Sequence, residues 1–189
     1  MVKSRRPARV AAVQTLYRLD ITKGDRTQAL LDLKEHGTLS PDQFLYAEKL
    51  VLGVIEHHKE LDERLEAVVE GYDYDRLATV DRNVLRVAAF ELFHESTIAP
   101  AVIIDEAIEI ARKYSMPESG KFINGILGKL LESSPKANWD SANAPPEQFE
   151  EAQEEEEMEI VEETIDIESE EAKKLQKFGA WKIRSEVTE

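Results

Sequence analysis

The chain of 189 residues contains no cysteine, so it can neither form a disulfide nor use a thiol as a nucleophile or zinc ligand. This absence is typical of proteins that work in a reducing cytosol. The sequence also lacks an apolar run of about 20 residues, the length needed to cross a bilayer. Its basic start is not followed by the apolar stretch of a secretory signal. We therefore expect a cytoplasmic protein without a membrane partner.

Sequence motifs for catalysis and cofactor binding are also missing. There is no G-x-x-x-x-G-K-[ST] loop, no G-x-G-x-x-G fingerprint and no G-x-S-x-G elbow. His57 and His58 are adjacent, so on a helix they point about 100° apart and cannot share a metal ion as an i, i+4 pair would. Asp105 and Glu106 fit the solvated side of an amphipathic helix. We expect no enzymatic activity, no cofactor and no metal site.

Positive charge is scarce, with 24 Lys and Arg residues against 39 Asp and Glu residues and a formal net charge of −15. Residues 135–189 alone hold 17 of the acidic and 6 of the basic residues. The other end of the chain is cationic, because the first acidic residue, Asp20, follows five basic ones: Lys3, Arg5, Arg6, Arg9 and Arg18. A polyanionic partner is therefore electrostatically possible despite the net charge.

Apolar residues recur at helical spacing through most of the chain, and no alternating run predicts a sheet. The sequence predicts an all-α body of about seven helices within residues 1–134, followed by a linker and an extended acidic tail over 135–189. We expect two small helical bundles, at about 4–71 and 78–132. Helix starts are predicted from capping residues and prolines at Ser4, Arg26, Ser40–Pro41, Thr79 and Ala99–Pro100, with further helices through Leu61–Val68 and Phe122–Leu131.

The first predicted helix carries a cluster of arginines, Arg5, Arg6 and Arg9. Guanidinium groups in the first turns repel one another and the positive end of the helix dipole, at a cost of a few tenths of a kcal/mol per pair. Because the planar fork of arginine binds two phosphate oxygens at once, the cluster is consistent with a phosphate site. An ordinary solvated surface explains it about as well.

The last predicted helix contains KFINGILGKL, in which Gly125 and Gly128 lie three residues apart. Each interior glycine costs about 1 kcal/mol relative to alanine. The two glycines create a smooth strip, which we interpret first as tight packing against a neighbouring helix. The alternative is a nucleic-acid site flanked by Lys121 and Lys129, with Phe122 stacking on an unpaired base.

Four blocks of the sequence, RRPARVAAVQTLY, VDRNVLRVAAFEL, VIIDEAIEIARKY and SGKFINGILGKL, stand in the order and spacing of the bacterial transcription antitermination factor NusB. The chain resembles this family over roughly residues 4–132. The resemblance implies an all-α fold of two three-helix bundles with a further helix. It also implies binding of the boxA element of ribosomal RNA leader transcripts together with NusE, a small-subunit ribosomal protein. This complex helps RNA polymerase to read through terminators.

The resemblance also implies roles for individual residues. Single-stranded boxA-type RNA is expected to contact Arg5, Arg6, Arg9, Gln14, Tyr17, Lys121, Phe122, Asn124 and Lys129. The interface with NusE is expected near Asp81 and Arg86. Tyr17 and Phe122 could instead mainly pack the two bundles together.

Two questions stay open at this level. The chain could be a protein-interaction module that keeps the NusB fold with weak or lost RNA binding and is regulated by its acidic tail. It could also form a homodimer that covers the RNA surface.

Overall fold

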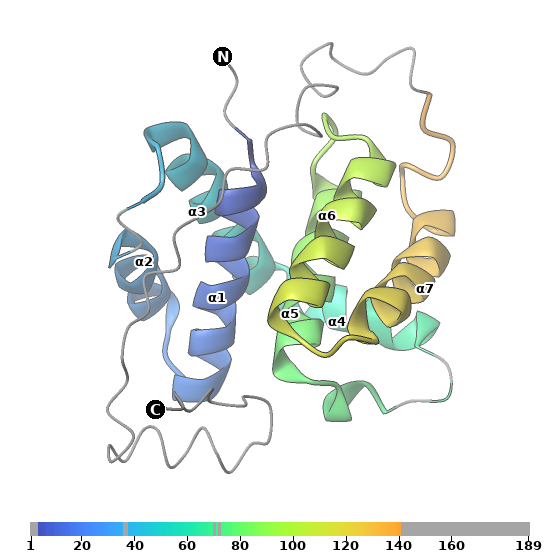
Figure 1. Cartoon of the computed structure of the whole chain (residues 1–189), viewed down its shortest axis with the longest axis horizontal. Helices are drawn as coiled ribbons and strands as arrows, with labels where there is room; N and C mark the ends of the chain where they lie inside the picture. The colour runs from blue at the N-terminus through green and yellow to red at the C-terminus, as the bar shows by residue number, and fades with distance from the viewer. Residues whose placement is uncertain (1–3, 36–37, 70, 72, 141–189) are drawn as a thin grey trace, which may run out of the picture. The chain divides into compact units, whose positions relative to one another are not determined.

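The structure is a computed structural model that describes residues 4–35, 38–69, 71 and 73–140. All of these belong to one compact unit, Met1–Glu154, whereas the second unit, Glu155–Glu189, lies outside the described residues. The described part contains seven α-helices and one short 3-10 helix, which confirms the predicted all-α fold. In chain order they are α1 (Arg6–Thr22), α2 (Arg26–Glu35), α3 (Pro41–Glu56), α4 (His58–Val68), η1 (Tyr74–Arg76), α5 (Thr79–His94), α6 (Pro100–Tyr114) and α7 (Ser119–Glu132) (Figure 1).

Local sequence signals explain most helix ends. Ser40 and Gln43 form a reciprocal capping box at the start of α3, where Pro41 occupies the first turn. Lys23 adopts a left-handed conformation with φ of 55° and ends α1. The stop signal predicted at His36–Gly37 lies outside the described residues.

Two predicted caps differ from the structure. Arg5, not Ser4, is the N-cap of α1, although the Ser4 hydroxyl accepts a hydrogen bond of 3.3 Å from the Arg6 N–H. Thr79 is the first residue of α5, which follows the N-cap Ala78 and has no side-chain cap. Both differences are shifts of one residue, because proline and threonine signals locate a helix start only to within a turn.

The helices form two groups joined through α5. Helices α1, α2 and α3 pack on one another, and α4, α5, α6 and α7 form the second group (Figure 1). Helix α5 also packs against α1 and α3, which makes it the shared central element. Helix α4 packs mainly on α5 and α7, so it lies with the second group, although we expected it in a first bundle reaching residue 71. Among the described residues, none of the helices is long and apolar enough to span a membrane.

The body of the protein continues past the predicted start of the linker. Ser134 and Lys136 are buried, and the Lys136 ammonium group donates a hydrogen bond to the carbonyl oxygen of Ile98. The same ammonium group lies 5.2 Å from the centre of the Trp139 ring. Burial lowers the pKa of Lys136 to about 8, although nearby Glu91 and Glu95 act in the opposite direction. The linker predicted from residue 135 therefore begins with a segment docked on the body, and the predicted tail beyond residue 140 lies outside the described residues.

Candidate nucleic-acid interface

The predicted RNA-binding residues come from two helices, α1 and α7. At the start of α1, Pro7 lies in the first turn, where its missing N–H has no helical partner to lose. This arrangement presents the side chains of Arg5 and Arg6 at the N-terminal end of the helix.

Arg6 forms a forked ion pair with Glu106 of α6. Its Nε lies 3.0 Å from Glu106 Oε2 and its Nη2 lies 2.8 Å from Glu106 Oε1. Hydrogen bonding to this carboxylate raises the pKa of Arg6. The side chain of Arg6 is still 43% exposed, so the guanidinium group is held in place at a position that a phosphate can reach.

Arg5 stacks on an aromatic ring of α3. Its guanidinium carbon lies 4.9 Å from the centre of the Tyr46 ring. Such a cation–π contact orients the group without neutralising its charge. Arg5 thus lies beside Arg6 at the start of α1 with its guanidinium group stacked on Tyr46.

Arg9 does not fit its predicted role as a phosphate ligand. Its side chain is 2% exposed, and its Nε and Nη2 lie 3.0 Å from Oε1 of Glu91 on α5. Its Nη1 lies 3.7 Å from Oε2 of Glu106. Because the nitrogens of the buried guanidinium group lie against two carboxylates of this chain, Arg9 serves the fold and not an external anion.

The network around Arg9 includes residues that the sequence did not suggest. The hydroxyl of Tyr46 donates a hydrogen bond to Glu91, and burial raises the pKa of Tyr46 well above its usual range. Glu106, which we expected on a solvated helix face, is buried between Arg6 and Arg9. Helices α1, α3, α5 and α6 are thus tied together through charged groups.

The other predicted residues of α1 lie further along the helix. Gln14 is exposed, and Tyr17 is partly buried against the hydrophobic core. Tyr17 therefore has a packing role, which was one of the two interpretations of its side chain.

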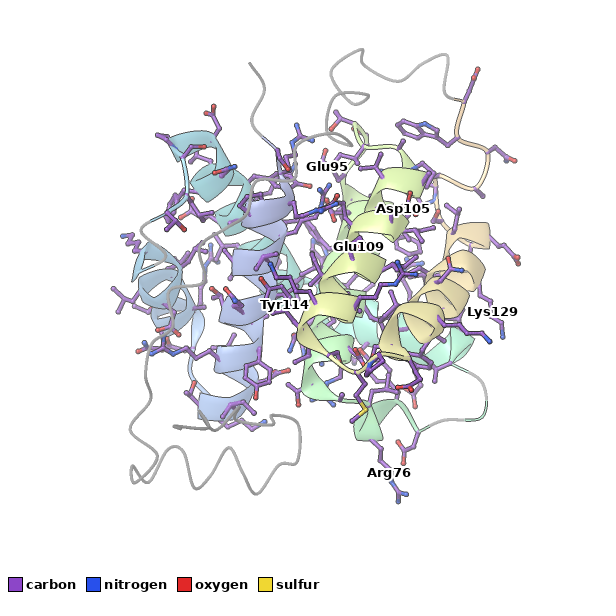
Figure 2. The ribbon with its side chains drawn as sticks, in the orientation of Figure 1. Arg76, Glu95, Asp105, Glu109, Tyr114 and Lys129 are labelled. Atoms are coloured by element: carbon purple, nitrogen blue, oxygen red, sulfur yellow. The ribbon has the colours of Figure 1, made fainter. Side chains whose placement is uncertain are left out.

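On α7, Lys121, Asn124 and Lys129 are exposed, whereas Phe122 is partly buried against the core. Figure 2 shows Lys129 on the outer side of α7. Gly125 and Gly128 face open space, because a Cβ atom placed on either one would meet no atom within 4 Å. The interpretation of these glycines as a packing contact within the chain is therefore wrong.

Helix α6 separates the two parts of the predicted site. It lies between α1 and α7 in the view of Figure 1, pairs with α1 through Glu106 and packs along α7. Exposed Asp105 and Glu109 are labelled along this helix in Figure 2. An RNA that contacted both α1 and α7 would have to pass these acidic side chains.

The C-terminal end of α6 adds basic residues that the sequence analysis missed. Arg112 and Lys113 are exposed in its last turn. Arg112 crosses the start of α7 so closely that a Cβ atom on Gly120 would lie 2.9 Å from its Cγ. Arg112 therefore lies against Gly120, the residue before Lys121, a contact that only the packing of α6 on α7 creates.

The two residues expected at a NusE interface are buried. Asp81 accepts a hydrogen bond of 2.9 Å from the Ser119 hydroxyl and so joins the starts of α5 and α7. Arg86 donates through Nε to Oδ1 of Asp62 at 2.7 Å and through Nη1 to Oδ2 of Asp20 at 3.0 Å. These contacts connect α5 to α4 and α1, so both side chains are fold residues and the expectation is corrected.

Comparison with known protein sequences matches this chain to one family. The NusB family model matches residues 6–132. The transcription antitermination protein NusB of Desulfitobacterium hafniense strain DCB-2 is 42% identical over 132 residues, which cover 69% of this chain and 89% of the relative. The NusB protein of Desulforamulus reducens is 38% identical over 133 residues, covering 70% and 93% of the two chains.

Solved structures of NusB proteins are also similar to this chain. The structure of T. maritima NusB matches with a TM-score of 0.65 and 34% identity, over 79% of this chain and 99% of that one. A crystal structure of the antitermination factors NusB and NusE in complex with dsRNA matches with a TM-score of 0.64 and 29% identity. It covers 70% of this chain and 99% of the matched chain.

The described residues define an all-helical protein whose two helix groups are joined by buried arginine–carboxylate pairs and which carries basic side chains at the ends of α1, α6 and α7. The matches identify it further: the chain belongs to the NusB family of transcription antitermination proteins. This membership confirms the resemblance of the four sequence blocks and agrees with the expectation of a non-enzymatic protein.

Proposed function

We propose that this protein binds boxA-type single-stranded RNA of ribosomal RNA leader transcripts together with NusE, and that this complex helps RNA polymerase to read through terminators. The observation that carries the proposal is the match, over 70% of the chain, to a solved complex of NusB and NusE with dsRNA, which supports RNA and NusE as partners. The partly exposed arginines at the start of α1 and the exposed cations of α6 and α7 supply the electrostatic component.

At the start of α1, Arg5 and Arg6 would bind RNA phosphates. Arg6 is already oriented by Glu106, so less side-chain entropy is lost when a phosphate binds. A phosphate that approached Arg6 would compete with Glu106, which could still pair with Arg9. Arg9 is left out of the proposed contact surface because it is buried.

On α7, Lys121 and Lys129 would bind further phosphates and Asn124 would hydrogen-bond a base. The bare backbone at Gly125 and Gly128 leaves space for a base or sugar to approach the helix closely. Phe122 is only partly exposed, so its ring would stack at an edge. NusE is part of the proposal, but Asp81 and Arg86 are excluded from its contact surface because both are buried.

The test is fluorescence anisotropy of a boxA-containing RNA, a scrambled RNA of equal length and a duplex RNA, each with and without NusE. The proposal expects a preference for single-stranded boxA that NusE strengthens. If the three RNAs bind equally well even with NusE present, the boxA proposal is wrong and the interaction-module alternative gains support.

A matched pair of variants locates the contact. The double variant Arg5→Ala, Arg6→Ala should weaken binding about 100-fold or more, since each charge-assisted hydrogen bond contributes about 1.5–3 kcal/mol. The control double variant Lys59→Ala, Arg76→Ala removes the same charge from exposed positions on α4 and η1 and should bind as the unchanged protein does. Arg76 lies at the lower end of the molecule in Figure 2, away from the start of α1. Equal losses of RNA affinity in both variants would show that overall charge, and not a specific contact at the start of α1, determines binding.

A further inference from the structure

Two histidines and a glutamate that are far apart in the sequence meet at the ends of three helices. His57 is the residue between α3 and α4, Glu60 lies in the first turn of α4, and His94 is the last residue of α5. One ligand atom from each of the three lies within 4.8 Å of those from the other two. Among the described residues, this is the one group of three possible metal ligands whose ligand atoms lie so close together.

The distances are close to those of a metal site. Zinc holds nitrogen and oxygen ligands at about 2.0–2.2 Å, which sets two tetrahedral ligand atoms roughly 3.4 Å apart. His57 Nδ1 lies 3.2 Å from Glu60 Oε2, and His94 Nε2 lies 3.9 Å from Glu60 Oε1. To surround one ion, the two imidazole rings have to rotate out of their stacked arrangement so that Nδ1 of His57 and Nε2 of His94 point at the same place.

The side chains of the two histidines pack against each other and against Phe90. The two imidazole rings stack with centres 4.0 Å apart, and the Phe90 ring stacks on His94 with centres 5.1 Å apart. Phe90 takes this position because Gly53 of α3 leaves room for it: a Cβ on Gly53 would lie 2.1 Å from the Phe90 ring. The packing of α3 on α5 therefore sets the positions of the histidines.

Glu60 is oriented by a positive group on its other side. Arg64 donates from Nε to Glu60 Oε1 at 3.1 Å, and its guanidinium carbon lies 4.2 Å from the centre of the Phe93 ring. Hydrogen bonding of a ligating carboxylate by an outer residue is a usual feature of metal sites. Oε1, the oxygen that lies 3.9 Å from His94 Nε2, is therefore shared with Arg64, whereas Oε2 is directed at His57.

The proposed site is accessible to an ion. The side chains of His57, Glu60 and His94 are 33%, 39% and 26% exposed, so an ion can enter from solvent. The ends of α3 and α5 contribute partial negative charge here, whereas the start of α4 and the guanidinium group of Arg64 contribute positive charge.

We propose that His57, Glu60 and His94 form a binding site for one divalent transition-metal ion of the zinc class. The three residues supply two nitrogen ligands and one oxygen ligand, and water completes the tetrahedron. The bound ion connects the α3–α4 junction to the end of α5, and so joins the two helix groups at a point remote in sequence from Arg5 and Arg6. The site rests on the geometry of the chain alone and is independent of the proposed RNA binding.

His58 provides a matched control because it is adjacent to a proposed ligand but points elsewhere. Its Nε2 lies 3.5 Å from Asp62 Oδ2, on the next turn of α4. This divergence from His57 agrees with the 100° angle expected for neighbours on a helix. A variant of His58 therefore removes an imidazole without removing a proposed ligand.

The experiment is a calorimetric titration of the full chain with zinc, at concentrations up to about 100 μM to cover affinities of micromolar and tighter. We expect one ion per chain at the tightest site and at least a 10-fold loss of affinity in His94→Ala and in Glu60→Gln, a loss on the order of that caused by disturbing even an outer metal contact. His58→Ala should change the affinity by less than about 2-fold. Two-dimensional NMR of the imidazole groups should show the signals of His57 and His94 shifting with zinc before those of His36 and His58.

Three outcomes would overturn the site. They are an unchanged chain that binds no zinc in this range, a His58→Ala variant that loses as much affinity as His94→Ala, and NMR shifts that begin at His58. Thermal melts without zinc show whether each variant is folded. If His94→Ala does not fold, Glu60→Gln still tests the loss of a proposed ligand.

Discussion

Arg9 is enclosed by Glu91, Glu106 and the ring of Tyr46, and its side chain is 2% exposed. The variant Arg9→Met fills a similar volume but leaves the carboxylate of Glu91 buried without its cation, while Glu106 keeps its ion pair with Arg6. We expect the free energy of unfolding to fall by about 3–5 kcal/mol, the usual cost of breaking a buried pair by removing one partner. Urea denaturation followed by circular dichroism measures this loss.

Arg5→Met is the control, because it removes the same charge four residues earlier from a partly exposed stacking position. Its effect should stay below about 1 kcal/mol. Equal losses in the two variants would show that Arg9 does not have the structural role assigned to it.

Asp62 gives a prediction of pH dependence. Burial alone would raise its pKa, but hydrogen bonds from Arg86 and Tyr74 outweigh this effect and hold the pKa below its usual value. The unfolded chain therefore binds the proton more tightly. The stabilisation is complete above the unfolded pKa of about 3.9 and is lost as the pH falls through the lower folded value.

We accordingly expect Asp62→Asn to be less stable than the unchanged protein at pH 7, with the difference shrinking below about pH 4. Urea midpoints measured from pH 7 down to pH 2 provide the comparison. A difference that stays constant over this range would mean that the carboxylate charge of Asp62 does not stabilise the fold.

At the scale of single residues, the sequence could predict chemical type but not burial. The spacing of Arg5 and Arg9 puts both on one side of α1, yet only Arg9 is enclosed. Its partner Glu91 is 82 positions away, and Glu106 is 100 positions from Arg6. Such pairs depend on how α5 and α6 pack against α1, which no local pattern encodes.

At the scale of the helix, the glycines of α3 and α7 have opposite roles. Gly53→Ala forces a Cβ to within 2.1 Å of the Phe90 ring and should destabilise the protein by about 1–3 kcal/mol through overpacking. Gly128→Ala adds a methyl group where space is open and should stabilise the helix by about 0.5–1 kcal/mol. Thermal melts of the two variants should therefore shift in opposite directions, and a shift in the same direction would contradict this assignment.

Helix starts were predictable because they depend on a few local residues. The starts of α3 and α6 follow from Pro41 and Pro100, each in the first turn of its helix. The grouping of helices was harder to predict from the sequence, since α4 follows α3 in the chain but packs mainly on α5 and α7. The docking of Lys136 was also missed, because the Pro, Ser and Asn content around it is typical of a linker.

For the whole molecule, the proposed RNA contacts predict a specific response to salt. If Arg5, Arg6, Lys121 and Lys129 each neutralise one phosphate, log affinity should fall with log salt at a slope of about −2.8, taking about −0.7 per contact for single strands. In the double variant Arg5→Ala, Arg6→Ala the slope should decrease in magnitude to about −1.4. Anisotropy titrations between low and physiological salt measure both slopes, and a slope near zero for the unchanged protein would refute the electrostatic contacts.

The open space at Gly128 gives direct experimental access to α7. Since the chain has no native thiol, a single cysteine introduced by Gly128→Cys would be the sole attachment point for a maleimide dye. The dye would project from a surface where no neighbouring side chain crowds it. Its emission would then report the approach of RNA or a protein partner to this helix, with no background cysteine to remove beforehand.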